Sequence, residues 1–363
     1  MKAGIVGLPN VGKSTLFNCL SNAKAQSANF PFCTIEPNIG VVNVPDSRIA
    51  TLEKMVNPER VVPATVEIVD IAGLVKGASK GEGLGNQFLG NIRETDAIIH
   101  VLRCFDNDNI IHVDTSIDPV RDKETIDIEL QLKDLETTEK RLERVKKNAK
   151  TGNKEAQAEL GVLLRIKAVL EAGKSVRTID FTDKESEFVL PMQYITAKPV
   201  MYVCNVDENA AVSGNTYVDK VKEAVADETA EIIVLAVGTE ADINELDDFE
   251  ERQIFLEDIG LTEPGSAKLI RVAYKLLNLQ TYFTVGVKEV RAWTINIGDT
   301  APQAAGVIHT DFEKGFIRAE VIKYNNFVEY GSEVKIREAG KLGVEGKEYI
   351  VQDGDIMNFR FNV

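Results

Sequence analysis

Residues 7–14 read Gly7-Leu8-Pro9-Asn10-Val11-Gly12-Lys13-Ser14, which is the pattern G-x-x-x-x-G-K-S. The pattern closes a short apolar stretch that begins at residue 2 and predicts a strand, and residues 14–20 predict a helix. In this setting it is a phosphate-binding loop, because its glycines let backbone N–H groups surround a phosphate and the helix dipole favours negative charge. We expect Lys13 to reach the β- and γ-phosphates and Ser14 to bind Mg²⁺. The remaining nucleotide contacts of the loop are expected from Asn10, Val11, Gly12 and Thr15.

A second motif, Asp70-Ile71-Ala72-Gly73, follows the apolar stretch at residues 64–69. One strand after a phosphate-binding loop, D-x-x-G is the second half of a nucleotide switch. We expect Asp70 to hold the metal through water and the Gly73 N–H to contact the γ-phosphate, which makes Gly73 and Lys13 the catalytic candidates of the two motifs. Thr34, which lies between the motifs, is the candidate for completing the Mg²⁺ shell. The glycines from Gly73 onward predict a segment that orders around a γ-phosphate.

The candidate base-recognition motif is Asn205-Val206-Asp207-Glu208, which ends the apolar stretch at residues 200–204. Guanine-specific proteins carry N-K-x-D at this place. Here Val206 replaces the lysine and the longer Glu208 replaces the aspartate, so the donors of guanine lose their matched partner. We therefore expect ATP to be preferred over GTP. In this interpretation the Val206 backbone N–H and C=O pair with the adenine edge, and Asn205 ties the loops together.

The apolar stretches at residues 64–69, 97–102, 200–204 and 232–236 are mostly continuous, as in strands buried on both faces of a parallel sheet. Helical patterns lie between them, which predicts a doubly wound α/β fold. The interval between residues 102 and 200 is too long for one crossover. Apolar positions predict two long helices there, joined by a turn at residues 151–153: Ile128, Leu132, Leu135 and Leu142 in the first, and Leu160, Leu163, Ile166, Val169 and Leu170 in the second.

We expect these helices to form a hairpin that projects from the sheet; two helices lying flat on the domain are the alternative. Residues 140–150 carry six positive side chains and one negative side chain. A phosphate-contacting tip and an ordinary solvated helix face explain this charge equally well. From residue 281 onward, short alternating strands are expected at residues 282–285, 290–295, 315–322, 348–351 and 357–361, with one helix at 300–311, which indicates a separate α+β module.

Composition narrows the class of protein. The chain has 363 residues, 44% hydrophobic and 27% charged, and a formal net charge of −15, which disfavours nucleic-acid binding through a generally basic surface. Its four cysteines lack C-x-x-C spacing, which argues against a zinc site or a disulfide framework. No apolar run has the length of a membrane span, and the first residues do not have the pattern of a signal peptide. We expect a cytoplasmic protein without a membrane partner.

A resemblance follows from these motifs together. The phosphate-binding loop, the segment F-P-F-C-T-I-E-P-N at residues 30–38 and the glycine-rich stretch that begins at Asp70 resemble the Obg-related branch of translation-factor GTPases. With Asn205-Val206-Asp207-Glu208, the inserted hairpin and the late segment Val351-Gln352-Asp353-Gly354-Asp355, nearly the whole chain resembles the YchF family of ribosome-associated ATPases. One departure is Ala236-Val237-Gly238-Thr239, which stands where such proteins carry Ser-Ala beside the base.

The resemblance implies three domains: a nucleotide-binding G domain at residues 1–123 and 198–278, a coiled-coil arm at 124–197, and a TGS domain of β-grasp fold at 279–363. It implies slow Mg²⁺-dependent ATP hydrolysis, binding to the large subunit or the whole ribosome, and regulation of translation by a monomeric protein. RNA contact is expected at the arm tip, Lys140–Lys150, and at the TGS domain.

Catalysis is the part that the motifs leave open. The residue that follows D-x-x-G is Leu74, which cannot orient an attacking water as a glutamine does there in Ras-like proteins. His112 is one candidate for supplying that function, with an ordinary surface or partly buried histidine as the alternative. Asn10 stands where related GTPases bind an activating K⁺. Two other functions stay open: an Obg-like GTPase in ribosome assembly, and an RNA- or protein-binding adaptor whose nucleotide is structural.

Overall fold

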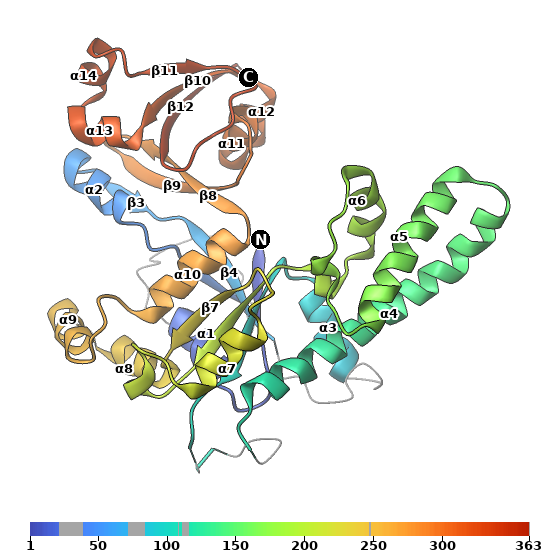
Figure 1. Ribbon diagram of the computed structural model, residues 1–363. Helices are drawn as coiled ribbons and strands as arrows, with labels where there is room; N and C mark the ends of the chain where they lie inside the picture. Colours follow the sequence, from blue (N-terminus) through green and yellow to red (C-terminus); the bar gives the residue numbers. More distant parts are fainter. Residues whose placement is uncertain (22–38, 72–83, 108, 111–115, 247, 363) are drawn as a thin grey trace. The chain divides into compact units, whose positions relative to one another are not determined.

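The structure is a computed structural model that describes residues 1–21, 39–71, 84–107, 109–110, 116–246 and 248–362 (Figure 1). These residues form two compact units. The first comprises Met1–Gly40 and Glu67–Leu269, and the second comprises Val41–Val66 and Ile270–Val363. The second unit therefore contains an early part of the chain, which the expected domain boundaries assign to the nucleotide-binding domain. The three-domain division with those boundaries stays a prediction.

A six-stranded sheet in the order β2-β4-β1-β5-β6-β7 carries the first motifs. Its strands are β1 (Lys2–Val6), β2 (Ile39–Asn43), β4 (Thr65–Asp70), β5 (Ala97–Arg103), β6 (Val200–Asn205) and β7 (Glu231–Leu235). From β4 to β7 all neighbours run parallel. Every residue of β5 and β6 is buried, which explains their continuous apolar sequences. The predicted α/β fold is confirmed.

Helices connect these strands. They are α1 (Lys13–Ser21), α3 (Leu84–Arg93), α4 (Pro119–Lys150), α5 (Lys154–Glu171), α6 (Asp183–Val189), α7 (Thr216–Ala224), α8 (Val237–Glu245), α9 (Phe249–Asp258) and α10 (Gly265–Leu276). Single turns of 3₁₀-helix occur at Val176–Thr178, Leu190–Met192, Ile195–Ala197 and Glu208–Ala210. None of the helices in the described ranges is both long and apolar enough to cross a membrane.

The predicted helical hairpin is confirmed as α4 and α5, but the buried face of α4 differs from the prediction (Figure 1). Ile128 is 52% exposed and Leu132 is 38% exposed. The buried positions of α4 include Ile126, Leu130, Asp134, Thr138, Leu142, Val145 and Ala149. Two polar residues in the middle of this face interrupt its apolar pattern, so the period of leucine and isoleucine alone points to the wrong side of the helix.

Asp134 explains one of these buried polar positions. Its carboxylate accepts hydrogen bonds from the backbone N–H groups of Ile195 (3.0 Å) and Thr196 (2.7 Å) and from the Thr196 hydroxyl (2.7 Å). The neighbouring Thr138 hydroxyl bonds to the Tyr194 hydroxyl at 3.0 Å. These bonds attach the middle of α4 to the segment that enters β6, which begins at Val200. They fix the root of the hairpin to the sheet.

The second unit contains a sheet in the order β11-β10-β12-β8-β9-β3. Its strands are β3 (Arg60–Val62), β8 (Leu279–Val285), β9 (Glu289–Asn296), β10 (Phe316–Lys323), β11 (Gly343–Glu345) and β12 (Asp355–Phe361). Its helices are α2 (Ser47–Val56), α11 (Ala301–Ile308), α12 (Thr310–Lys314), α13 (Tyr324–Tyr330) and α14 (Glu333–Glu338). The predicted α+β module is present, with β3 as an edge strand that pairs in parallel with β9.

Two predictions for this module are wrong. The expected strand at residues 348–351 is absent from the described structure, where Ile350 forms only an isolated bridge with Thr300. The apolar pattern there reflects an irregular segment: Val351 is buried, and its N–H donates to the Asp299 carbonyl at 3.0 Å. The single helix expected at residues 300–311 is two helices, α11 and α12, which are separated at His309.

Removing the Asp134 carboxylate should destabilise the root of the hairpin. Asp134→Ala leaves two buried N–H groups without an acceptor, so the free energy of local opening should fall by about 3 kcal/mol. Hydrogen exchange of the Ile195 and Thr196 amides measures this change. The control is Asp219→Ala on the exposed face of α7, which should change the same amides by less than about 0.5 kcal/mol. Equal effects of the two variants would contradict the assignment.

Candidate nucleotide-binding site

The loop from Gly7 to Gly12 leaves the carboxyl end of β1 and leads directly into α1. Gly12 has φ 102°, and a Cβ atom there would lie 2.4 Å from Nδ2 of Asn205. A Cβ at Gly7 would lie 2.6 Å from the Val101 carbonyl oxygen. The two glycines of the pattern are therefore required by close approach of β5 and β6, as well as by the space that a phosphate needs.

Lys13 is buried at the start of α1, and its Nζ donates to the Leu8 carbonyl at 2.7 Å. Burial lowers the pKa of Lys13 to about 8, and the nearby Asp70 carboxylate opposes this shift. A buried ammonium group with one backbone acceptor is incompletely compensated, so an incoming phosphate would be a better partner. Asn10, at the turn of the same loop, has φ 63°, a left-handed conformation that asparagine tolerates.

Asp70 lies at the end of β4, where its carboxylate forms a hydrogen bond with the Ser14 side chain. Burial raises the pKa of Asp70, while Ser14 and Lys13 oppose the shift. A hydroxyl and a carboxylate side by side at the phosphate loop are the ligand types that Mg²⁺ accepts. The described residues hold no cluster of three or more His, Cys, Asp or Glu side chains able to bind a metal by themselves. The donor set thus fits an Mg²⁺ ion that phosphates and water help to hold.

Asn205 connects three loops with one side chain. Its Nδ2 donates to the Val11 carbonyl at 2.9 Å, and its Oδ1 accepts the Val237 N–H at 3.1 Å. Asn205 is only 4% exposed, so both ends of the amide are paired in a dry environment. The expectation that Asn205 ties the loops together agrees with this geometry.

The residues after Asn205 differ from one another in their surroundings. Val206 is buried, and its N–H donates to the Leu235 carbonyl at 3.0 Å. That N–H is therefore engaged within the sheet, contrary to the expectation that it pairs with adenine. Asp207 accepts the Ala210 N–H at 3.2 Å and caps a short 3₁₀ turn. Glu208 is exposed and lines the cavity beside the loop.

A cavity of about 580 Å³ lies where these loops meet. It brings together several predicted residues, Asn10, Gly12, Thr15, Asn205, Val206 and Glu208. The start of α8 also lines it, with Val237, Gly238 and Thr239, the residues that stand in place of Ser-Ala. Thr34, Gly73, Leu74 and His112 lie outside the described residues.

Sequence reasoning missed one wall of this cavity, which consists of Phe105, Asp106, Asn107 and Ile110. Arg103, at the end of β5, is only 1% exposed and donates to the carbonyls of Phe105, Asn107 and Ile110 at 3.2, 3.0 and 2.9 Å. The position of this loop at the carboxyl end of a central parallel strand was the available signal, because ligands bind at that edge.

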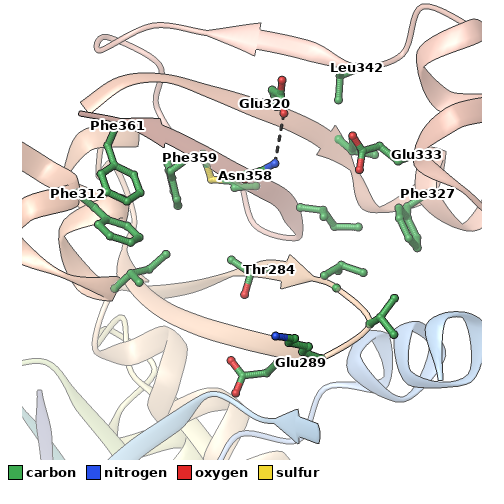
Figure 2. Close-up of a pocket in the computed structure, with 18 residues that line it drawn as sticks. Thr284, Glu289, Phe312, Glu320, Phe327, Glu333, Leu342, Asn358, Phe359 and Phe361 are labelled. Carbon is green, nitrogen blue, oxygen red and sulfur yellow. Dashed lines mark hydrogen bonds between the residues drawn. The ribbon is translucent and has the colours of Figure 1, made fainter. Parts of the chain in front are cut away.

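A second hollow of about 590 Å³ lies in the other unit, between the β8–β9 hairpin and strands β10 and β12 (Figure 2). Its acidic side chains have partners: Glu320 accepts from Asn358 (3.3 Å) and Arg360 (3.1 Å), and Glu333 pairs with Arg337 at 2.9 Å. Apolar side chains such as Phe312, Phe327 and Phe361 form much of the remaining wall. The phosphate-binding motifs do not contribute to this hollow.

A glycine-bounded loop between β1 and α1, Ser14 beside Asp70, and a base-side cavity held by Asn205 define a P-loop nucleotide-binding protein. Two family models match the chain. One is described as a 50S ribosome-binding GTPase and matches residues 2–151; the other, for the C-terminal region of YchF GTPases, is described as a protein of unknown function and matches residues 279–362.

Relatives match over the full length. "Ribosome-binding ATPase YchF" of Escherichia coli O157:H7 is 58% identical over 362 residues, covering 100% of this chain and 99% of that protein. The Bacillus subtilis (strain 168) protein of the same name is 53% identical and covers 100% of both. The structure titled as the Schizosaccharomyces pombe YchF GTPase has a TM-score of 0.90 at 39% identity, covering 99% of this chain and 97% of that one. The chain belongs to the YchF family, as the resemblance predicted.

The lowered pKa of Lys13 makes nucleotide affinity depend on pH. In the free protein Lys13 loses its proton above pH of about 8, whereas bound phosphates stabilise the charged form. ATP binding should therefore take up about one proton at pH 9, and affinity should fall by about tenfold per pH unit above that pKa. Calorimetry in buffers of different ionisation enthalpy measures the uptake. Adenosine, which lacks phosphates, is the control, and an equal pH dependence for both ligands would contradict this role of Lys13.

Proposed function

We propose that this protein is an ATP-hydrolysing switch that binds the ribosome and regulates translation. The observation that carries the nucleotide choice is the base side of the cavity, where buried Val206 and exposed Glu208 replace the lysine and aspartate of guanine-specific proteins. The names of the bacterial relatives, which are ribosome-binding ATPases, support both parts of the proposal.

The described residues would divide the work as follows. The loop N–H groups and Lys13 bind the phosphates, and Lys13 carries its proton toward the β- and γ-oxygens. Ser14 and Asp70 would hold Mg²⁺, directly and through water, and the bound ion would neutralise charge on the phosphates. Asn205 keeps the phosphate loop and the start of α8 at a fixed separation, because its amide bonds to both. This positions the base relative to the phosphates.

The remaining catalytic assignments extend the proposal. Gly73 would donate its N–H to the γ-phosphate, and Thr34 would complete the metal shell. His112 would orient water in place of a glutamine, which Leu74 cannot do. Asn10 would bind K⁺, whose charge would stabilise the transition state. Rates for His112→Ala, and for the wild type in K⁺ against Na⁺, test the last two roles; unchanged rates would leave catalysis to a partner.

Nucleotide choice is tested by restoring the guanine motif. The wild type should bind a fluorescent ATP analogue at least about tenfold more tightly than the GTP analogue in the presence of Mg²⁺. Val206→Lys/Glu208→Asp should shift the ratio toward GTP by about 10²-fold, because a site with matched hydrogen-bond partners discriminates strongly. Glu208→Asp alone should shift it in the same direction, and it leaves the buried Val206 in place.

The control for nucleotide choice makes the same two changes at exposed positions that do not line the cavity, Val212→Lys and Glu223→Asp. The ATP preference of this variant should equal that of the wild type. A wild type that binds GTP more tightly would replace the proposal with the second candidate, a GTPase in ribosome assembly. The S. pombe relative, titled a GTPase, keeps that candidate in view.

The hairpin tip is the proposed contact with ribosomal RNA. Lys140 pairs with Glu136, and Arg141 pairs with Glu159 at 2.6 Å. No ion pair joins Arg144, Lys146, Lys147 or Lys150 to another residue that the structure describes, and all four side chains are exposed. Such side chains are available to phosphates at little desolvation cost. The C-terminal module would supply further contacts. The site is built from one chain, and we infer a monomer acting in the cytoplasm.

Charge reversal at the tip tests this contact. Lys146→Glu/Lys147→Glu should weaken ribosome binding by at least about tenfold and reduce the slope of log affinity against log salt by about 2. Lys184→Glu/Lys222→Glu makes the same charge change at exposed positions on α6 and α7 and should leave the slope unchanged. Equal weakening by both variants would contradict a specific role for the tip. Equal affinity with ATP, ADP and no nucleotide would favour the adaptor alternative.

A further inference from the structure

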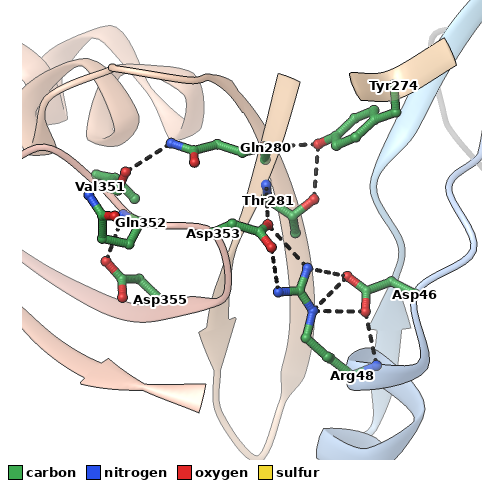
Figure 3. Close-up of polar contacts among 9 residues, drawn as sticks. All are labelled: Asp46, Arg48, Tyr274, Gln280, Thr281, Val351, Gln352, Asp353 and Asp355. Atoms are coloured by element: carbon green, nitrogen blue, oxygen red, sulfur yellow. Dashed lines mark hydrogen bonds and ion pairs between the residues drawn. The ribbon is translucent and has the colours of Figure 1, made fainter. Parts of the chain in front are cut away.

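Arg48 holds together two segments of the second unit that are about 300 residues apart in the chain (Figure 3). From α2, its Nη1 and Nη2 donate to the two carboxylate oxygens of Asp353 at 2.8 and 3.1 Å. Its Nε and Nη2 donate to Asp46 at 2.9 and 2.8 Å. The guanidinium also lies 5.3 Å from the centre of the Phe283 ring. One planar cation thus bridges two carboxylates, an arrangement that lysine cannot reproduce.

The C-terminal partner is itself fixed. Asp353 Oδ1 accepts the Thr281 N–H at 3.1 Å, and the Gly354 N–H donates to the Thr281 carbonyl at 2.7 Å. Gly354 has φ 85°, and a Cβ there would lie 2.7 Å from Nη1 of Arg48. The segment Val351-Gln352-Asp353-Gly354-Asp355, which the nucleotide chemistry does not use, therefore presents a carboxylate to Arg48 and leaves room for the guanidinium.

The N-terminal partner belongs to the stretch between the two phosphate motifs. Residues 41–66 follow the phosphate-binding loop and precede Asp70. Their strand β3 ends at Val62 and pairs with β9, and two residues later β4 begins and runs to Asp70, which bonds to Ser14. A strand is stiff along its length, so a displacement of Asp70 on nucleotide binding is passed along β4 toward β3.

We propose that Arg48 and Asp353 form a clasp through which the nucleotide state of the phosphate site is transmitted to the C-terminal module. The clasp makes residues 41–66 move with β8 and β12, so that the chain between the two phosphate motifs becomes a mechanical part of the module. The proposal rests on the proposed nucleotide-dependent function and adds the route by which the site and the module communicate. Asp353 is about half exposed, so the role of the pair is positioning rather than a large contribution to stability.

Hydrogen–deuterium exchange of the full chain tests the clasp, with and without a non-hydrolysable ATP analogue and Mg²⁺. In the wild type, the analogue should change exchange by at least about threefold at residues 1–21 and 200–208 and also at 60–62, 279–296 and 355–361. In Arg48→Gln and in Asp353→Asn the change at the first two ranges should remain, and the change at residues 279–296 and 355–361 should vanish. The double variant should behave like either single variant, because both remove one interaction.

Arg337→Gln is the matched control, since Arg337 forms an exposed ion pair with Glu333 on α14 in the same unit. It should keep the wild-type response. Arg48→Lys, which retains the charge and so protects the fold, should give a reduced response. A full response at residues 279–296 in Arg48→Gln would overturn the clasp, as would a wild type that binds the analogue without any response there. Failure of the wild type to bind the analogue would overturn the proposed function instead.

Discussion

The amide of Asn205 is the interaction on which the nucleotide site depends. Its two ends bond to the phosphate loop at Val11 and to the start of α8 at Val237, and Gly12 allows the approach because it has no Cβ. Because the side chain is buried, losing it would leave two backbone groups without partners. The contact continues beyond the cavity. Glu240, in the first turns of α8, accepts the N–H groups of Gly265 and Ser266 at 2.7 and 3.1 Å and caps α10.

Local constraints explain which parts of the fold were predictable. A phosphate-binding loop needs its strand, its glycines and its helix within a few residues, and buried parallel strands need continuous apolar sequences, so these elements follow from the sequence. The buried face of α4 does not, because Asp134 and Thr138 occupy it for partners about 60 residues away. The pairing of β3 with β9 is also non-local. A three-residue strand carries no pattern that identifies its partner.

The candidate site shows the same division. Lys13, Ser14, Asp70 and Asn205 were predictable because each belongs to a motif at the end of a strand, and the described structure brings them to one edge of the sheet. The wall from Phe105 to Ile110 was not, since it is shaped by Arg103, a buried cation whose partners are three backbone carbonyls. Sequence reasoning treats arginine as a surface residue. The Val206 N–H was misassigned because β7 already uses it.

The divided second unit also constrains how the chain folds. Residues 41–66 are made early, but Val61 pairs with Val290, more than two hundred residues later. Until β9 exists, β3 is a strand edge without its partner, and Arg48 lacks Asp353. Closing so long a loop costs entropy that only the completed sheet offsets, so the parallel sheet of the first unit, whose β1 and β4 are both early, can form first. The segment that joins the phosphate motifs therefore acquires its final contacts only when the C-terminal module has folded, which links completion of the module to the final arrangement of the chain around the nucleotide site.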